Sequence, residues 1–210
     1  MQIVLIRHAE STANAAGILA GRASDVALSD NGEQQCLALH ESFHNLEFDA
    51  VLSSPISRCL QTARITFPEI DQPIIDNSFI EMDFGDWTGK LLKELSELAE
   101  WKRVQNSPAE FRFPNGESFA ELRTRVASGL MKIIDEYRSA QRICIFTHAD
   151  VIKMGISWLL DSPLNRFQRI SIDPASISIL NKNESDFMVR SVNLDARSER
   201  IQQVLRNDHS

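Results

Sequence analysis

The chain has few cysteines and no long apolar run. Its three cysteines, Cys36, Cys59 and Cys144, are an odd number and lack the paired spacing of a metal site or a disulfide framework. No apolar stretch approaches the length that spans a membrane. Arg7 and His8 also interrupt the N-terminal apolar run too early for a signal peptide. We therefore expect a cytoplasmic protein with reduced thiols and no membrane partner.

An excess of basic residues is also missing. The chain carries 22 lysines and arginines against 29 aspartates and glutamates, which is a net charge of −7 at pH 7. Nucleic acid is therefore not an expected partner. If the protein binds an anion, it must do so in a local basic pocket on an acidic molecule.

No repeat, low-complexity tract or long linker divides the 210 residues. A hydrophobic content of 43% is that of a globular protein with a substantial core. We predict one domain over residues 1–194 and a polar C-terminal tail over residues 195–210 that is frayed. A homodimer is compatible with the sequence, although no residue pattern argues for it.

Short apolar runs alternate with helical patterns along the chain. Extended segments are predicted at 3–6, 49–54, 73–80, 142–147, 176–180 and 187–192. Helices are predicted from Ser29 or Asp30 to about Leu46, after Pro55, and over 91–104, 117–137 and 150–160, with a loop at 12–26. This order predicts an α/β fold, a three-layer α/β/α sandwich with a mainly parallel central sheet. The last two strands are expected to add an antiparallel edge.

Two of the predicted strands end in a histidine. The run Ile3–Ile6 leads into Arg7 and His8, and the run Arg142–Thr147 leads into His148. Because the carboxyl ends of parallel strands meet at one edge of a sheet, these side chains are expected to converge. Arg58, on the helix after the second strand, and Glu81, after the third, would reach the same edge.

This set of residue types suits the transfer of a phosphoryl group. A phosphoryl group in transfer spreads negative charge over its oxygens, and arginine binds such oxygens with permanently charged, bidentate hydrogen bonds. Two guanidinium groups beside an imidazole disfavour its protonation, which keeps a nitrogen lone pair available for attack. A carboxylic acid near the leaving oxygen could protonate it and later activate water.

The same residues lie in motifs that resemble those of the histidine phosphatase superfamily, which includes the cofactor-dependent phosphoglycerate mutases. The matching segments, in order, are Arg7-His8-Ala9-Glu10-Ser11, the stretch from Asn14 to Gln35, Ser53–Ala63, Glu81–Gly89, Asn115–Ser118 and Thr147-His148. The resemblance runs from Gln2 to about Ile156.

The resemblance implies a fold like that of phosphoglycerate mutase and a role for each matching residue. His8 would be the nucleophile that forms a phosphohistidine, and Glu81 would be the proton donor and later the base. Arg7, Arg58 and His148 would hold the phosphoryl oxygens, while Asn14 and Gly21 would line the substrate side. Arg22 is a further candidate for substrate binding. No metal ion and no cofactor are implied.

Several positions depart from the family pattern or leave alternatives open. Ala9 replaces a glycine and is tolerable only with a negative φ. Asp150 brings an acid close to the predicted anion pocket, although it might only cap its helix. The loop around Arg22 is one residue longer than usual, which leaves the direction of that side chain open. Asp83 and Asp86 are alternatives to Glu81 as the proton donor, and Phe84, Trp87, Phe111 and Phe113 are candidates for a substrate wall or for simple packing.

We interpret the chain as a phosphatase acting on a small phosphorylated metabolite. It has Ala13-Asn14 where the mutases carry Trp-Asn, and it is too short for the inserted segments with which a mutase excludes water. The alternatives are a mutase-type phosphotransferase and a catalytically inactive member that only binds phosphoanions.

Other catalytic patterns are absent or weak. The segment His40-Glu41-Ser42-Phe43-His44 matches the zinc-protease pattern, but both histidines lie off the apolar stripe of their helix, so a solvated face is the better interpretation. No cysteine is followed by an arginine at the spacing of a cysteine phosphatase, and there is no phosphate-binding loop of the Walker type.

Overall fold

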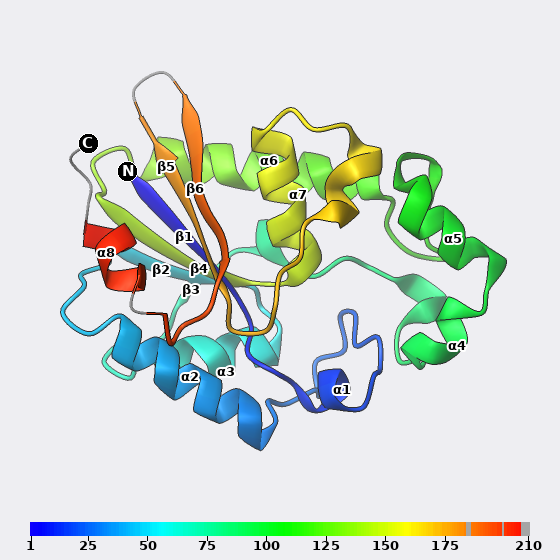
Figure 1. Ribbon diagram of the computed structural model, residues 1–210, viewed down its shortest axis with the longest axis horizontal. Helices are drawn as coiled ribbons and strands as arrows, with labels where there is room; N and C mark the ends of the chain where they lie inside the picture. Colours follow the sequence, from blue (N-terminus) through cyan, green and yellow to red (C-terminus); the bar gives the residue numbers. More distant parts are fainter. Residues whose placement is uncertain (184–185, 199, 207–210) are drawn as a thin grey trace.

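The fold is built on a central β-sheet, whose strands are in the order β3-β2-β4-β1-β5-β6. The computed structural model describes residues 1–183, 186–198 and 200–206 (Figure 1). Within them the strands are β1 (Gln2–Arg7), β2 (Ala50–Ser53), β3 (Ile74–Ile75), β4 (Arg142–Thr147), β5 (Ile177–Lys182) and β6 (Phe187–Leu194).

Strands β1 to β4 are parallel and the last two strands are antiparallel. β1 pairs with β4, β4 with β2, and β2 with β3, all in parallel register. β5 runs antiparallel to β1, and β6 antiparallel to β5. The prediction of a mainly parallel sheet with an antiparallel edge is therefore confirmed. Because β1 and β4 are neighbours, Arg7 lies opposite Thr147, and the two following histidines leave the sheet at the same edge.

Helices cover both faces of the sheet. α2 (Asp30–Ser42), α3 (Ser57–Thr66) and α8 (Arg200–Arg206) lie on one face, and α6 (Phe119–Glu136) and α7 (Ala149–Leu159) on the other (Figure 1). Side chains alternate along a strand, so β1 sends Ile3 and Leu5 into the core under α6 and α7, and Val4 and Ile6 into the core under α2 and α3. The predicted three-layer α/β/α sandwich is confirmed.

Shorter elements gather beyond the carboxyl edge of the parallel strands. These are α1 (Thr12–Ala15), α4 (Leu92–Ser96) and α5 (Ala99–Asn106), with the 3-10 turns η1 (Asn77–Phe79), η2 (Gly85–Trp87), η3 (Pro108–Glu110) and η4 (Leu164–Arg169). Figure 1 shows α1, α4 and α5 on the side towards which β1 points. These segments enclose the functional site.

Element boundaries differ from the predicted ones in three places. The helix expected to reach Leu46 ends at Ser42, because Asn45 adopts a left-handed conformation with φ of 63°. The helix expected over 91–104 is two helices, since Leu98 is extended between α4 and α5. The loop predicted at 12–26 begins with α1, whose single turn is closed by a reciprocal capping box between Ser11 and Asn14.

The C-terminal segment packs on the sheet, contrary to the predicted fraying. Ala196, Ile201 and Leu205 are buried in the core under α2 and α3, at 8%, 0% and 0% exposure. Ile201 and Leu205 are four residues apart in α8 and therefore lie on the same face of the helix, which is why both side chains can be buried together. Residues 207–210 lie outside the described residues. Within the described ranges, none of the helices combines the length and the apolarity needed to cross a membrane.

Candidate active site

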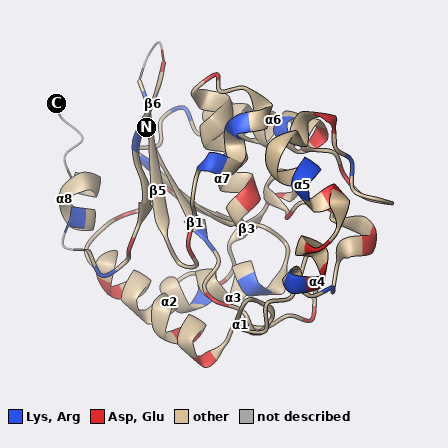
Figure 2. Cartoon of the chain, turned by 45° about the vertical axis from the view of Figure 1, so that its right-hand side comes forward, with Lys and Arg blue, Asp and Glu red and all other residues tan. Residues whose placement is uncertain are grey.

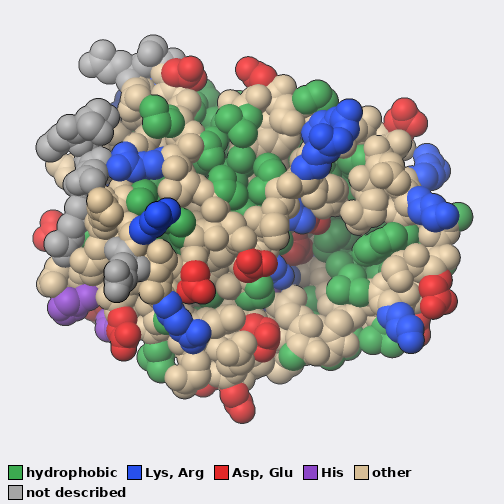
Figure 3. Space-filling model, viewed as in Figure 1, with side chains coloured by type: hydrophobic (Ala, Val, Ile, Leu, Met, Phe, Trp, Pro, Cys, Tyr) green, Lys and Arg blue, Asp and Glu red, His purple; other side chains and the backbone are tan. Residues whose placement is uncertain are grey.

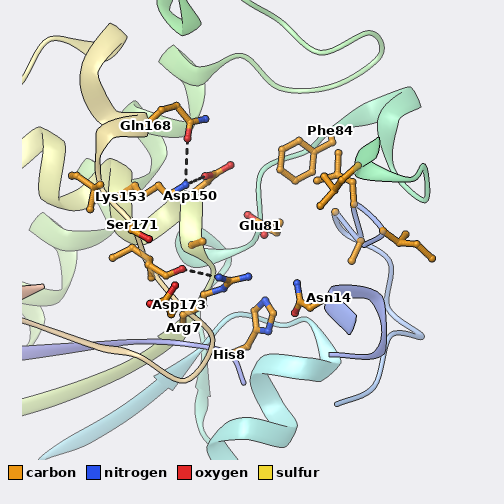
Figure 4. A pocket seen from close by; sticks show the side chains of 18 of the residues that line it. Arg7, His8, Asn14, Glu81, Phe84, Asp150, Lys153, Gln168, Ser171 and Asp173 are labelled. Atoms are coloured by element: carbon orange, nitrogen blue, oxygen red, sulfur yellow. Dashed lines mark hydrogen bonds and ion pairs between the residues drawn. The ribbon is translucent and has the colours of Figure 1, made fainter. Parts of the chain in front are cut away.

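A cleft of about 590 Å³ opens at the carboxyl ends of β1 and β4. Arg7, His8, Arg58 and Glu81 line its floor, and Figure 4 shows three of these side chains around one space. His148 lies behind them, with its ring centroid 5.2 Å from that of His8. The structure therefore brings together all five residues predicted from the two strand ends and the two following segments.

His8 is buried and held in one tautomer by the backbone. Its Nδ1 lies 2.8 Å from the carbonyl oxygen of Ala9, and because a carbonyl only accepts hydrogen bonds, Nδ1 carries the proton. Burial, followed by the charges of Arg58 and Arg7, holds the pKa of His8 well below its usual value. The ring is therefore neutral and its Nε2 carries a lone pair.

Arg58 links the two histidines to the neighbouring loop. Its Nε donates to His8 Nε2 at 3.2 Å. Its Nη2 donates both to the carbonyl oxygen of Gly21, at 2.8 Å, and to His148 Nδ1, at 3.2 Å. The side chain is 1% exposed. The arginine reaches this point because α3 begins directly after β2, which places Arg58 in the first turn of the helix.

Arg7 adds a second guanidinium with an uncommitted donor. Its Nη1 donates to the carbonyl oxygen of Ile172 at 2.7 Å, which fixes the side chain against the segment after η4. Its buried Nε finds no hydrogen-bond partner among the described residues. A buried donor without a partner is costly, so this atom suits an anion bound in the cleft.

His148 is fully buried behind the cleft. Its Nδ1 accepts the hydrogen bond from Arg58, and its Nε2 lies 2.8 Å from the hydroxyl of Ser54. Burial and the adjacent charge of Arg58 keep its pKa well below the usual value, so this ring is also neutral. The thiol of Cys59 lies 3.4 Å from Nε2, and burial raises the pKa of that thiol to about 12.

Glu81 provides a carboxyl group on the far side of the same space. Its Oε2 lies 3.5 Å from His148 Nδ1 and 3.8 Å from an Nη of Arg58. Burial and the negative charge of Asp150 raise the pKa of Glu81 to about 7, against the opposing effect of Arg58. A carboxyl group with this pKa can both give and take a proton near neutral pH.

Asp83 and Asp86, the alternatives to Glu81, bind groups outside the cleft. The Asp83 carboxylate lies 3.5 Å from an Nη of Arg22 and also accepts from the backbone of Gly85. The Asp86 carboxylate accepts from the side-chain amide of Asn115 at 3.1 Å. Neither residue lines the cleft, so Glu81 is the better placed carboxyl group.

Arg22, predicted as a candidate for substrate binding, does not line the cleft. Its Nε donates to the backbone carbonyl of Glu81 at 2.8 Å, and its Nη2 donates to the Glu117 carboxylate at 3.2 Å. Glu117 also binds Arg125 at 2.9 Å, and Arg125 donates to the carbonyl oxygens of Ser78 and Ile80. The two arginines thus hold the backbone of the segment that carries Glu81.

The other predicted substrate-side residues do line the cleft. Asn14 lies beside His8 in Figure 4, where its Oδ1 accepts from the backbone and hydroxyl of Ser11. Gly21 adopts a φ of 52°, and a Cβ there would lie 2.6 Å from the hydroxyl of Thr88. Ala9 keeps a negative φ, which meets the condition for its methyl group.

The wall opposite Phe84 holds Asp150, as the sequence predicted, together with Lys153 and Gln168, which the sequence did not single out. Lys153 Nζ lies 3.2 Å from the Asp150 carboxylate and 3.3 Å from the side-chain oxygen of Gln168 (Figure 4). Asp150 therefore does not cap its helix; it pairs with Lys153 one turn later. The spacing of three residues between opposite charges was a signal for this pair. Gln168 comes from η4, in a segment with no readable pattern.

The aromatic candidates divide between cleft and core. Phe84 lines the cleft. Trp87, Phe111 and Phe113 are 4%, 5% and 1% exposed and pack on one another with ring centroids 5.0 to 5.7 Å apart. His40 is exposed on α2 and contacts the carbonyl oxygen of Thr66, and His44 is exposed in the turn that follows α2. The described residues contain no group of three or more histidine, cysteine, aspartate or glutamate side chains suited to a metal ion.

Basic residues gather around this cleft although the chain is acidic. Figure 2 shows lysines and arginines at the end of β1, on α3 and on α7, all bordering the same opening. Acidic residues lie at this opening as well as over the rest of the chain, and Glu81, Asp150 and Asp173 line the cleft. Asp150 is paired with Lys153, whereas Arg7 and Arg58 lie together at the floor, so basic groups predominate where an anion would bind, in a chain with a net charge of −7.

Comparisons with known proteins agree with this geometry. The sequence profile of the histidine phosphatase superfamily (branch 1) matches residues 3–195. Phosphoserine phosphatase 1 of Hydrogenobacter thermophilus is 28% identical over 197 residues, which is 92% of each chain. The adenosylcobalamin/alpha-ribazole phosphatase of Escherichia coli K12 is 30% identical over 196 residues, covering 92% of this chain and 96% of its own.

A solved structure extends the similarity to the fold. The alpha-ribazole phosphatase of Shigella flexneri superposes with a TM-score of 0.83 at 28% sequence identity. The match covers 94% of this chain and 98% of the other.

Proposed function

The chain belongs to the histidine phosphatase superfamily, as a phosphoric monoester hydrolase, and we propose that it works through a phosphohistidine formed on His8. One observation carries this proposal. The carbonyl oxygen of Ala9 fixes the proton on Nδ1, so the lone pair of His8 is on Nε2, beside Arg58 and at the floor of the cleft. A neutral imidazole with a fixed tautomer is prepared for nucleophilic attack.

The two arginines and His148 bind the phosphoryl group. Arg58 Nε, which now donates to His8 Nε2, and the buried Nε of Arg7 would each donate to a phosphoryl oxygen. His148 takes a proton from solvent when the dianion neutralises the nearby guanidinium charges, donates a hydrogen bond to a third oxygen, and returns the proton to solvent when phosphate leaves. These protein cations supply the charge stabilisation, so the proposed reaction needs no metal ion.

The first half-reaction breaks the ester and forms a phosphorus–nitrogen bond. The Nε2 lone pair of His8 attacks phosphorus, and the bonding pair of the ester leaves with the alcohol oxygen. Protonated Glu81 donates its proton to that oxygen, which releases a neutral alcohol. The pKa of Glu81 at about 7 supports this role, because a large share of the group is protonated at neutral pH.

The second half-reaction restores the enzyme. Glu81, now a carboxylate, takes a proton from water, and the water oxygen attacks phosphorus. The phosphorus–nitrogen bonding pair returns to His8 Nε2, which yields inorganic phosphate and the starting protonation states. Water must reach the site for this step, and the cleft is open enough to admit it.

We further propose that the substrate is a small phosphorylated metabolite. A cleft of about 590 Å³ lies in the range of ligand sites for small molecules. The relatives named above are phosphatases for phosphoserine and for alpha-ribazole phosphate, which are different small molecules. Their names support the class of substrate and do not choose between its members.

The test is hydrolysis of an aryl phosphate in the presence of EDTA, with wild type, His8→Ala and His44→Ala. His44 is exposed in the turn that follows α2 and serves as the matched histidine control. We expect metal-independent turnover in the wild type and in His44→Ala, and its loss in His8→Ala. Acid-labile phosphate should also accumulate on the wild-type protein during rapid-quench experiments, and not on His8→Ala.

Two other results would contradict the proposal. Turnover that disappears with EDTA but survives His8→Ala would mean that the reaction takes place elsewhere and needs a metal ion. Phosphate binding without any turnover on a panel of phosphate esters between pH 5 and 8 would instead favour an inactive, phosphoanion-binding protein.

A further inference from the structure

An apolar cavity borders the active-site cleft at the end away from His8. This cavity, the aromatic recess, has a volume of about 170 Å³ and is walled by Leu19, Phe84, Trp87, Trp101, Val104 and Phe113. Leu19 and Phe84 line the cleft as well. The recess and the cleft therefore meet at a shared rim, and a molecule bound in the cleft can extend into the recess.

The aromatic rings of the recess hold one another in place. Trp87 and Trp101 stack with centroids 6.2 Å apart and an interplanar angle of 20°. Phe84 and Phe113 meet edge to face at 5.0 Å. Trp87 and Phe113 are almost fully buried, whereas Trp101 is half-buried on α5. Such a wall presents ring faces and edges to a planar group, and because the rings are already fixed, binding costs no free energy for ordering them.

The charged groups of the rim are paired, and its other polar side chains are those of Gln168 and the exposed Gln105. On the side opposite Leu19 and Phe84, Lys153 contacts both Asp150 and Gln168, at 3.2 and 3.3 Å. Figure 4 shows these three side chains facing Phe84 across the opening. Because the rim charges neutralise each other, the recess offers no free charge to an ionic substituent. Its ligand is therefore an uncharged group.

The whole site is polar at one end and apolar at the other. The guanidinium groups of Arg7 and Arg58 lie at the floor of the cleft, and the recess lies beyond Phe84. Figure 3 shows the hollow with charged side chains deep in it and a cluster of hydrophobic side chains along one flank. A cavity of roughly 150 Å³ is enough to hold a benzene ring, so the recess has room for a small ring system.

We propose that the aromatic recess is the binding site for the leaving group, and that the enzyme acts on phosphate monoesters whose alcohol carries a flat, uncharged aromatic or heteroaromatic ring. This inference rests on the proposed function, because it takes the phosphoryl group to be bound at His8. The ring stacks beside Trp101 and Phe84, and the ester oxygen lies between the recess and Glu81.

The first test measures binding without a phosphate group. Ligand-observed saturation-transfer NMR is recorded with 2-naphthylmethanol and with glycerol on the wild type, Trp101→Leu and Trp158→Leu. Trp158 is a half-buried tryptophan on α7 outside the recess, so it is the matched control. We expect saturation of the naphthyl protons in the wild type and in Trp158→Leu, a weaker signal in Trp101→Leu, and none for glycerol.

The second test measures selectivity in turnover. We compare kcat/KM for 2-naphthylmethyl phosphate with kcat/KM for glycerol 2-phosphate, two alkyl esters of which only one carries a ring. Trp101→Leu should reduce the ratio of the two values roughly three- to tenfold, the usual contribution of an aromatic pair. Trp158→Leu should leave the ratio unchanged.

The outcomes separate the two proposals. Turnover of both esters with no preference for the ring, and no change of the ratio in Trp101→Leu, would overturn the recess as a leaving-group site and leave the phosphatase mechanism intact. Absence of turnover on both esters and on the panel of phosphate esters, together with naphthyl saturation that Trp101→Leu weakens, would overturn the proposed function, and the recess would then bind an aromatic ring but no leaving group. Absence of naphthyl saturation in the wild type would contradict the recess whatever the kinetics.

Discussion

The guanidinium Nε of Arg58 donates a hydrogen bond to Nε2 of His8 at a distance of 3.2 Å. The donor occupies the lone pair that the proposed mechanism uses for attack. A bound phosphoryl group must therefore take over this hydrogen bond, which exposes Nε2 only when substrate is present. Burial lowers the pKa of His8 most, and the fixed positive charge of Arg58 lowers it further, so the ring stays neutral.

The first prediction concerns this arginine. Arg58→Lys should lower kcat roughly 10²- to 10³-fold, because the donors of an ammonium group all lie on one atom, whereas Arg58 reaches the position of the phosphoryl group with Nε and both Gly21 and His148 with Nη2. Steady-state kinetics at saturating aryl phosphate measures the effect. Arg64→Lys, an exposed change on the same helix, should retain wild-type turnover. A kcat for Arg58→Lys within threefold of wild type would contradict the role of the planar guanidinium.

The second prediction concerns the pH dependence of the first half-reaction. Glu81 has a pKa of about 7 and must be protonated to donate to an alkyl alcohol. The kcat/KM for an alkyl phosphate should therefore fall as the pH rises above about 7. Glu81→Gln should lower this kcat/KM roughly 10²- to 10⁴-fold and remove the fall at pH 7. For a p-nitrophenyl ester, Glu81→Gln should lower kcat/KM less, since the leaving group of that ester needs no proton. Asp83→Asn is the control, and its kcat/KM should still fall above about pH 7.

The third prediction concerns stability, because the raised pKa of Glu81 is also a cost of folding. A rise from 4.5 to about 7 corresponds to roughly 3 kcal/mol. The folded state holds the proton more tightly than the unfolded state, so the cost is absent below pH 4.5, grows between pH 4.5 and 7, and is complete above pH 7. Glu81→Gln should therefore be more stable than wild type at pH 8 and equally stable at pH 4.

Urea unfolding at the two pH values measures this difference. Equal free energies of unfolding for wild type and Glu81→Gln at pH 8 would mean that the carboxylate is stabilised as well in the folded protein as in water. A Glu81→Gln variant that is more stable but inactive would instead show that the protein gives up stability to keep this buried carboxyl group.

The fourth prediction concerns Glu117 as a positioning residue. Its carboxylate holds Arg22 and Arg125, which both donate to backbone carbonyl groups of the segment that carries Glu81. Glu117→Gln should weaken the ion pairs with both arginines, so that Glu81 is less precisely positioned and kcat falls roughly 10- to 100-fold. The fall in kcat/KM near pH 7 should also shift, because the surroundings of Glu81 change.

Asp135→Asn, which removes an exposed ion pair with Arg138, is the matched carboxylate control. If Glu117→Gln only lowers the melting temperature, and the folded variant keeps its kcat and pH profile, then Glu117 supports the fold and does not position Glu81.

The fifth prediction concerns the C-terminal helix. Leu205 is fully buried, so Leu205→Ala should reduce the free energy of unfolding by roughly 2 to 5 kcal/mol. Met188→Ala, at a position that is 54% exposed, should change it by less than about 0.5 kcal/mol. Urea unfolding of both variants checks this. A small effect at Leu205 would restore the interpretation of residues 195–210 as a tail that adds little to stability.

Much of the fold was predictable because its signals are local. The apolar run before Arg7 and the run before His148 each specify a strand by composition, and parallel pairing then brings their ends to one edge. Ser29 and Ser118 each start a helix through a side-chain hydrogen bond within the first turn. The order of the motifs along the chain also determined the family.

Other features depended on contacts between residues far apart in the sequence. The direction of Arg22 was decided by Glu117, 95 positions away, together with the backbone carbonyl of Glu81, because a guanidinium next to a carboxylate and a carbonyl oxygen binds both before it reaches a cleft. The burial of Ile201 and Leu205 depended on an apolar patch left open by α2 and β5. The aromatic recess needs α5 and the segment around Trp87 to meet.

The sequence by itself thus determined the strands, the helix starts and which charged and titratable side chains reach the carboxyl edge of the sheet, since each is encoded within a few residues. The tertiary structure alone decided which proton His8 carries, how far burial raises the pKa of Glu81, and which charges of the cleft are paired. Those properties arise from desolvation and from partners that only the folded chain brings together.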